Sequence, residues 1–341
     1  MESTKSNKEK IRIGIVGLGW IAQVFHVPIL LKLPDVEIAC VCDKDKARAR
    51  AIAEKYGIKR YYADYNEMLL SEELDAIDIC TPTDMHKEVA IAGMESKCDV
   101  FVEKPVARKY DEALAIVDVA KKTKRKLMVG MNHRFRPDTM MLRSFIENNE
   151  LGKIFYVKSG WLRKPVTENN WIAQKAISGG GVVLDLGIVM LDLGLWMMGY
   201  PEITRVNAAN YSHVSPGVED SSAIFLSTKS GATVTIEVSW TFQIENELQY
   251  CNIYGEAGSG KINPLKIHKQ MHGNVVNVTP SKIDTNDNLL KRSYENELKH
   301  FVGAVRGLYP LISTAHEALQ RMKIVEAIYK SAQKKKEIYL K

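Results

Sequence analysis

The stretch that decides the fold is IRIGIVGLGWIA, residues 11–22, in which a short apolar run ends at Gly17 and leads into the pattern G-x-G-x-x-A. A short apolar run bounded by glycine is typical of a buried strand, and the longer apolar stretch that follows indicates a helix. Gly17 permits a tight turn, Gly19 lets the backbone approach a pyrophosphate, and Ala22 allows close packing of helix on strand. The pattern predicts a strand, a phosphate-binding loop and a helix N-terminus that faces the phosphates.

Strand and helix signals keep alternating through the first third of the chain. We expect further strands over 37–42, 76–80, 99–102 and 127–130, and helices over 46–55, 87–94 and 111–122. Short strands alternating with helices predict right-handed βαβ units and a doubly wound parallel sheet of the Rossmann type. Asp43 directly follows the second strand, where an acidic side chain binds ribose hydroxyls and repels a 2′-phosphate. NAD is therefore favoured over NADP, although Lys44 and Arg48 nearby weaken that contrast.

The pattern changes after residue 131. Residues 232–241 (ATVTIEVSWT) alternate strictly, with Val234, Ile236, Val238 and Trp240 on one face, which predicts a half-buried strand of an antiparallel sheet. Other strands are expected over 154–161, 203–209, 223–228 and 250–254, with a buried helix over 181–198 and two closing helices. We therefore expect a Rossmann dinucleotide-binding domain over 1–131 and an α/β domain over 132–341 for substrate binding and oligomerisation.

Composition narrows the class of protein. The 341 residues have 47 Lys+Arg and 41 Asp+Glu, a balance of +6 that is too thinly spread to argue for a nucleic acid or a membrane partner. Five cysteines without a C-x-x-C spacing favour neither disulfides nor zinc, so we expect no metal and a reducing, cytoplasmic setting. The N-terminus is polar, and we expect no segment of about 18 apolar residues that could span a membrane.

Five further motifs, in order, are similar to those of the Gfo/Idh/MocA oxidoreductases. Thr81-Pro82-Thr83-Asp84-Met85-His86 resembles the T-P-N-x-x-H segment of that family, and Glu103-Lys104-Pro105 its E-K-P. Residues 130–135 (GMNHRF) resemble G-x-N-x-R-F, and the run from Gly179 to Asp192 resembles G-G-G-x-x-x-D-x-G-x-H-x-x-D. Residues 297–307 resemble the closing E-x-x-x-F-x-x-x-x-x-G element. The resemblance covers residues 11–332, nearly the whole chain.

The resemblance implies a Rossmann domain followed by an α/β domain with a large open, mostly antiparallel sheet. It implies an NAD(P)-dependent oxidoreductase that acts on CH–OH groups of sugars, cyclitols or related polyols, and a homodimer or homotetramer formed through the second sheet. Lys104 and Asp185 are the expected catalytic residues. The expected cofactor residues are Gly17, Gly19, Trp20, Ile21, Ala22, Asp43, Thr81, Pro82, His86, Glu103 and Lys104. The expected substrate residues are Asn132, Arg134, Trp161, Arg163, Lys164, Asp185 and Val189.

One position departs from the family pattern. The family's catalytic His falls on Val189, and valine can neither accept nor donate a proton. One hypothesis is that Lys104, helped by Asp185, transfers the proton. Another is that a different side chain enters the site, with Asp192, His133, His213 and Tyr211 as candidates. Two further hypotheses stay open, namely a glycoside-cleaving enzyme that retains NAD and an NAD(H)-binding sensor with a silenced site.

Overall fold

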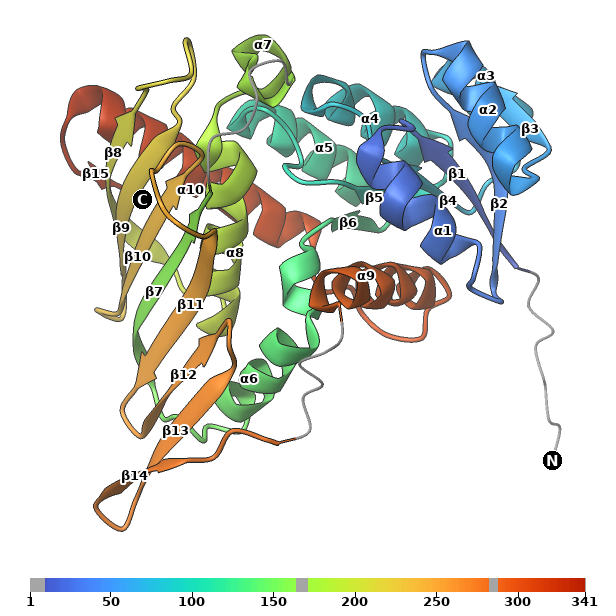
Figure 1. The fold of residues 1–341 in the computed structure, drawn as a ribbon. Helices are drawn as coiled ribbons and strands as arrows, with labels where there is room; N and C mark the ends of the chain where they lie inside the picture. Colours follow the sequence, from blue (N-terminus) through green and yellow to red (C-terminus); the bar gives the residue numbers. More distant parts are fainter. Residues whose placement is uncertain (1–9, 164–170, 282–287, 341) are drawn as a thin grey trace, which may run out of the picture. The chain divides into compact units, whose positions relative to one another are not determined.

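The computed structural model describes residues 10–163, 171–281 and 288–340, which divide into two compact units (Figure 1). Unit 1 comprises the described residues up to 103 together with 115–130 and 294–315. Unit 2 comprises 104–114 and the described residues of 131–293 and 316–341. The functional domain limits expected from the sequence, 1–131 and 132–341, stay a prediction.

Unit 1 is built on a six-stranded parallel sheet. Its strands are β1 (Ile11–Val16), β2 (Val36–Cys42), β3 (Arg60–Tyr62), β4 (Ala76–Ile79), β5 (Asp99–Val102) and β6 (Leu127–Val129). They lie in the order β3-β2-β1-β4-β5-β6, which is the order of dinucleotide-binding sheets. β1, at the centre, pairs with β2 and β4, and the strand order reverses there. Ligands of such sheets bind beyond the carboxyl ends of the strands at this reversal.

The helices associated with this sheet differ at their N-termini, and two of them begin at an aspartate cap. The first begins at Trp20 and continues through the π-helical η1 (Ala22–His26) and α1 (Val27–Leu30). Asp45 caps α2 (Lys46–Tyr56) by accepting from two backbone N–H groups, and Asp64 caps α3 (Tyr65–Ser71) in the same way. The remaining helices are η2 (Thr83–Met85), α4 (His86–Glu95), α5 (Tyr110–Thr123) and α9 (Leu289–Val305).

Unit 2 is built on a nine-stranded, mostly antiparallel sheet. Its strands are β7 (Ile154–Leu162), β8 (Ile203–Tyr211), β9 (Ser221–Thr228), β10 (Thr233–Ser239), β11 (Leu248–Gly255), β12 (Gly258–Ile262), β13 (Lys266–Met271), β14 (Asn274–Asn277) and β15 (Ile338–Tyr339). They lie in the order β14-β13-β12-β11-β7-β10-β9-β8-β15, with β7 and β10 parallel. Val234, Ile236, Val238 and Trp240 are all buried, which confirms the expected alternation.

One face of this sheet is covered by a strongly apolar helix. The helix α8 (Ile188–Met197) follows the π-helical η5 (Val183–Gly187) and packs across β7, β10 and β11. Other helical segments of the unit are η3 (Asn132–Phe135), α6 (Pro137–Glu147), η4 (Trp171–Ala173), α7 (Lys175–Ser178) and α10 (Ala315–Lys334). By length and composition alone Lys175–Met197 could cross a membrane, so the expectation that no such segment exists was wrong. Of its most apolar window 78% is buried inside the protein, as expected of the core helix predicted over 181–198.

The fold class expected from the sequence is confirmed. A parallel sheet of Rossmann order and a large, mostly antiparallel sheet both occur. The sequence patterns missed β3, α3, α6 and the three strands at one edge of the second sheet. Most of those elements are short or largely exposed, for example β14, in which all four residues are exposed. The exception is α6, a helix of 11 residues of which only Met140 and Glu147 are exposed.

Candidate active site

The glycine loop of unit 1 has the geometry of a phosphate cradle. Gly17 has φ +90°, and a Cβ there would lie 2.6 Å from the backbone of Cys80 and Thr81, so that only glycine fits. Gly19 has open space where a Cβ would stand, which leaves room for a ligand against the backbone. Asp43 accepts a hydrogen bond from the Leu18 N–H at 2.8 Å and thereby holds the loop to the end of β2. Ala22 is fully buried, as close packing of helix on strand requires.

Asp43 lies where a ribose-binding carboxylate is expected. Besides the Leu18 N–H, its carboxylate accepts from the Asp45 N–H at 2.9 Å, and the Arg48 guanidinium approaches it to 3.3 Å. The Asp43 side chain is only 6% exposed, whereas that of Arg48 is 44% exposed. A negative charge is therefore fixed at this position, and the neighbouring positive charge is carried by a more exposed side chain.

The other expected cofactor residues of unit 1 gather near the ends of β1, β4 and β5. Trp20 is 68% exposed and meets Phe25 edge-on. The hydroxyl of Thr81 is buried without a hydrogen-bond partner among the described residues. His86 is buried, and its Nε2 lies 2.9 Å from the carbonyl of Thr81, so that it holds the turn after β4. Ile21 and Pro82 are half-buried. The open space at Gly19 and the unsatisfied Thr81 hydroxyl fit a bound dinucleotide.

A buried charge cluster, which the sequence did not reveal, lies in the same unit. Nδ1 of His26 lies 2.8 Å from the Asp78 carboxylate, and its Nε2 lies 3.2 Å from that of Glu103. Burial alone would lower the pKa of His26, but Asp78, followed by Cys80, outweighs it and holds that pKa well above its usual value. The two carboxylates therefore favour the charged form of the imidazole. Its Nδ1, the Asp78 carboxylate and the Cys80 Sγ lie within 4.8 Å of one another, so the three could also hold a metal ion.

Lys104 and Asp185 form an ion pair in unit 2. Lys104 is the second residue after β5 and donates to Asp185 Oδ1 at 2.6 Å and to the Asp185 carbonyl at 3.1 Å. The indole N–H of Trp240 donates to Asp185 Oδ2 at 3.0 Å. Burial raises the pKa of Asp185, but Lys104, and after it Trp240 and Arg163, lower it further, so that the net pKa falls below its usual range. The carboxylate is therefore ionised and both of its oxygens are engaged.

The expected substrate residues are placed in different surroundings. Trp161 donates through its indole N–H to Glu247 at 2.5 Å, and Arg163 lies 3.5 Å from the same carboxylate. Asn132 donates to the hydroxyl of Ser293. Val189 is 3% exposed on α8, four residues beyond Asp185. Lys164 lies outside the described residues.

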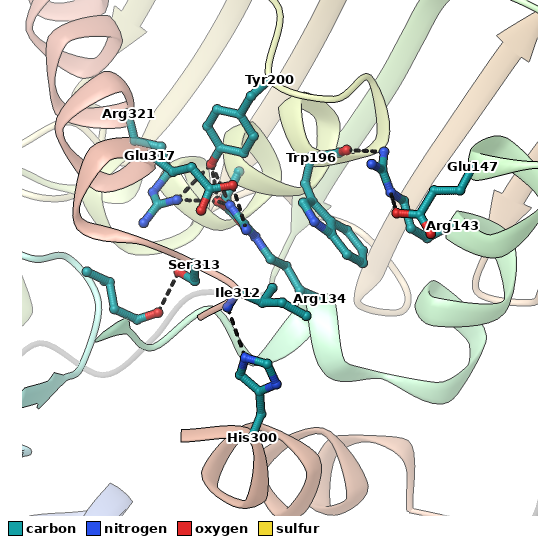
Figure 2. Close-up of polar contacts among 12 residues, drawn as sticks. Arg134, Arg143, Glu147, Trp196, Tyr200, His300, Ile312, Ser313, Glu317 and Arg321 are labelled. Atoms are coloured by element: carbon teal, nitrogen blue, oxygen red, sulfur yellow. Dashed lines mark hydrogen bonds and ion pairs between the residues drawn. The ribbon is translucent and has the colours of Figure 1, made fainter. Parts of the chain in front are cut away.

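Arg134 is part of a buried ion network rather than an open surface (Figure 2). Its guanidinium binds both oxygens of Asp192, at 2.8 and 2.6 Å, and Glu317 at 3.0 Å. Arg321 donates to Asp192 at 2.6 Å, and the Tyr200 hydroxyl also hydrogen-bonds Asp192. The side chains of Arg134, Asp192 and Arg321 are at most 2% exposed. This geometry favours a structural role for Arg134 over the substrate contact expected from the sequence.

Comparison with known families agrees with the two sheets. Residues 11–131 match the model of an oxidoreductase family with an NAD-binding Rossmann fold, and residues 143–340 match its C-terminal α/β domain. The chain belongs to the Gfo/Idh/MocA family of oxidoreductases. The resemblance noted from the sequence motifs is thereby confirmed.

Named relatives of the chain act on sugars and inositols. The chain is 28% identical to the D-glucoside 3-dehydrogenase of Escherichia coli over 95% of both chains. It is 27% identical to the NAD⁺-dependent scyllo-inositol 2-dehydrogenase of Bacillus subtilis over 90% of both. Its structure is similar to that of a putative myo-inositol dehydrogenase from Sinorhizobium meliloti, with a TM-score of 0.82, 25% identity and coverage of 97% of this chain and 100% of that one. A levoglucosan dehydrogenase bound to NADH and levoglucosan shares the fold with a TM-score of 0.89, at 20% identity and 97% and 99% coverage.

The four side chains that could replace the missing family His differ in their exposure and in their partners. Asp192 is held by two arginines. His213 and Tyr211 are exposed and stack on each other. His133 is 5% exposed and meets Trp161 edge-on, and burial, with the charges of Arg136 and Lys104, lowers its pKa to about 3. Lys104 acts electrostatically on His133, which is neutral at working pH.

The His26 cluster predicts a pH-dependent stability. Folding raises the pKa of His26, so the charged side chain contributes to the free energy of unfolding. That contribution is complete below the unfolded pKa of about 6.5 and is lost as the pH rises through the folded pKa. Above pH 6.5 the wild type should lose up to about 1.4 kcal/mol of unfolding free energy per pH unit relative to His26→Gln. Urea unfolding from pH 6 to 9.5 measures this difference. The exposed His316→Gln serves as control and should follow the wild type, whereas parallel curves for His26→Gln and wild type would contradict the prediction.

The Asp192 network predicts a large structural cost. Asp192→Ala leaves two buried guanidinium groups without their shared carboxylate, so we expect a loss of about 3–5 kcal/mol in unfolding free energy. Glu202→Ala removes one partner of the exposed Lys229–Glu202 pair and should change stability by less than about 1 kcal/mol. Urea unfolding of both variants at pH 7 compares them, and equal effects would refute the structural role of Asp192.

Proposed function

We propose that this protein is an NAD-dependent dehydrogenase that transfers a hydride between the nicotinamide and a CH–OH group of a sugar, cyclitol or related polyol. The observation that carries the proposal is the Lys104–Asp185 ion pair. Lys104 is the second residue beyond the carboxyl end of β5, a strand in a sheet of dinucleotide-binding order, and its side chain is 28% exposed. The family to which the chain belongs, and the names of its relatives, support the same class of reaction.

Oxidation of an alcohol requires a hydride acceptor and a proton acceptor. A bound NAD⁺ supplies the first. We assign the second to Lys104, whose amine takes the hydroxyl proton when it is neutral and returns it when it is charged. Oxidation should therefore become faster as pH rises, and the reverse reaction slower. Asp185 orients the Lys104 side chain through the 2.6 Å contact and stabilises the ammonium that forms.

The substrate side of the proposal rests on Trp161, Arg163, Asn132 and Asp185. Aromatic faces stack on the C–H faces of sugars, and hydroxyl groups need donors and acceptors of this kind. Arg163 is next to Glu247 at 3.5 Å, so part of its charge is already compensated. A neutral polyol fits such a site better than an acidic sugar. Because the relatives named above include a D-glucoside and an inositol dehydrogenase, we propose substrates of those two kinds.

We propose NAD as the preferred cofactor because the buried carboxylate of Asp43 would repel a 2′-phosphate. A relative from Haloferax volcanii that uses NADP⁺ is 27% identical, so the family tolerates either cofactor. All five cysteines are free and buried, which is compatible with the reducing, cytoplasmic setting that we propose. We further propose a homodimer or homotetramer formed through the face of the second sheet that carries Phe225 and a hollow of about 300 Å³.

The reaction is tested by mixing protein, NAD⁺ and a panel of D-glucosides, inositols, levoglucosan and D-xylose while following NADH absorbance. We expect turnover with at least one member, and Lys104→Ala should lower kcat about 10²–10⁴-fold, the usual size of acid–base catalysis. NADH binding, followed by its fluorescence, should persist in the variant. Lys109→Ala removes an exposed lysine five residues on and should leave kcat within about twofold. Full activity of Lys104→Ala, or NAD binding without turnover on any substrate, would refute the proposal.

Cofactor preference is tested with Asp43→Asn. Loss of the fixed charge should raise KM for NAD⁺ and narrow the ratio of kcat/KM between NAD⁺ and NADP⁺ by about tenfold, since about 1.4 kcal/mol of discrimination corresponds to that factor. Asp45→Asn is the matched control, because Asp45 is a more exposed carboxylate two residues on. An equal change in both variants would show that net charge, rather than the Asp43 contact, sets the preference.

A further inference from the structure

Trp240 lies directly after β10 on the helix-covered face of the second sheet. Its side chain continues the buried face formed by Ile236 and Val238 and is 7% exposed. Its backbone N–H donates to the carbonyl of Asp220 at 2.9 Å, which fixes the strand end against β9. The indole therefore has a defined orientation even though it lies beyond the last residue of the strand.

The helical segment that contains and follows Asp185 packs closely on this strand, most tightly at Gly194. At Gly187 a Cβ would lie 3.6 Å from the side chain of Val238, and at Gly194 it would lie 3.3 Å from that of Val234. The π-helical η5, which contains Asp185, contacts β7, β9 and β10. This close approach brings the Asp185 carboxylate within 3.0 Å of the Trp240 indole nitrogen.

The two oxygens of Asp185 have different partners. Oδ2 accepts from the indole N–H of Trp240, and Oδ1 accepts from the ammonium of Lys104. A carboxylate bound at both oxygens cannot rotate freely about its Cβ–Cγ bond. The indole also takes up part of the negative charge, so that the carboxylate holds the proton on Lys104 less strongly than it would alone.

We propose that Trp240 is a positioning residue, which fixes the Asp185 carboxylate and thereby sets the pH at which Lys104 gives up its proton. The inference rests on the proposed function, in which Lys104 carries the proton. Two other groups act on the pair. Arg163 lowers the pKa of Asp185, and His133 is neutral over the pH range in question because its pKa is about 3. Neither group is altered by a change at residue 240.

The test compares the wild type with Trp240→Phe, which keeps an aromatic ring and removes the N–H. We expect kcat for oxidation at pH 7 to fall about 5–10-fold, while KM for substrate and the Kd of NADH change less than twofold. The midpoint of the rising pH–kcat profile should move up by about half to one pH unit, with recovery to within threefold of wild type at high pH. Trp196→Phe is the matched control, since its indole packs against Arg134 and Arg143, and its profile should not move.

A second variant and a second measurement separate this inference from the proposed function. Benzothienylalanine at residue 240 keeps the bicyclic ring and replaces the N–H by sulfur, so it should behave as Trp240→Phe does even if the smaller ring disturbs packing. The rate at which acetic anhydride modifies Lys104, followed by peptide mass spectrometry against pH, reports the proton on Lys104 without turnover. A raised midpoint of the Lys104 acetylation profile in both variants supports positioning by Trp240. If no substrate is turned over but this midpoint still rises, only the redox assignment fails. Unchanged midpoints in both variants would overturn the inference.

Discussion

The long apolar helix of unit 2 is buried at its N-terminus, where water cannot reach it. Its first backbone N–H groups therefore need hydrogen-bond acceptors from the protein itself. Glu219 provides one of them, because its carboxylate accepts from the N–H groups of Gly181 and Val183 at 2.9 and 3.0 Å. The hydroxyl of Tyr329 donates to the same carboxylate at 2.8 Å. A Cβ at Gly181 would overlap the backbone of Glu219, so this close contact requires glycine at position 181. Since η5 and α8 follow directly, the cap determines where Asp185 enters the site.

Burial also explains why Asp192, the second acidic residue of that helix, needs charged partners. Asp192 lies inside the protein, and an isolated carboxylate there would be strongly unfavourable. Burial raises its pKa, but Arg134 and Arg321 lower it more, so that it stays ionised. Two carboxylates seven residues apart on one apolar helix therefore have different uses. Asp192 is compensated entirely by side chains of the protein, whereas Asp185 pairs with a lysine that is partly exposed.

Local sequence predicted the elements that are regular and strongly apolar, such as β1, β5 and the helix over 181–198, because their periodicity reflects their own burial. The glycine loop and Asp43 were predictable for a similar reason. Gly17 directly follows β1 and Asp43 directly follows β2, so each is located by the end of an apolar strand. Local sequence could not predict the contact of Trp240 with Asp185, because 55 residues separate them and Trp240 had the pattern of an ordinary core position. The ion pair of Arg134 with Asp192 could not be predicted either, because a motif position does not show whether a guanidinium faces a ligand or an internal carboxylate. The charge cluster of His26, Asp78 and Glu103 likewise joins three separate segments.

The valine at position 189 changes how the remaining polar groups must be understood. In an apolar helix, four residues after Asp185, a valine removes a titratable group and adds a buried apolar contact. A neutral His133 is a weak base, because with a pKa of about 3 it binds a proton poorly at pH 7. In the proposed function, proton transfer depends on Lys104, and its control depends on the groups that contact the partner of Lys104. Asp185 is that partner, and the indole of Trp240 donates to its second oxygen. With valine in place of the family histidine, we therefore propose a joint role for the three side chains. The lysine carries the proton, and the carboxylate and the tryptophan set how strongly it is held.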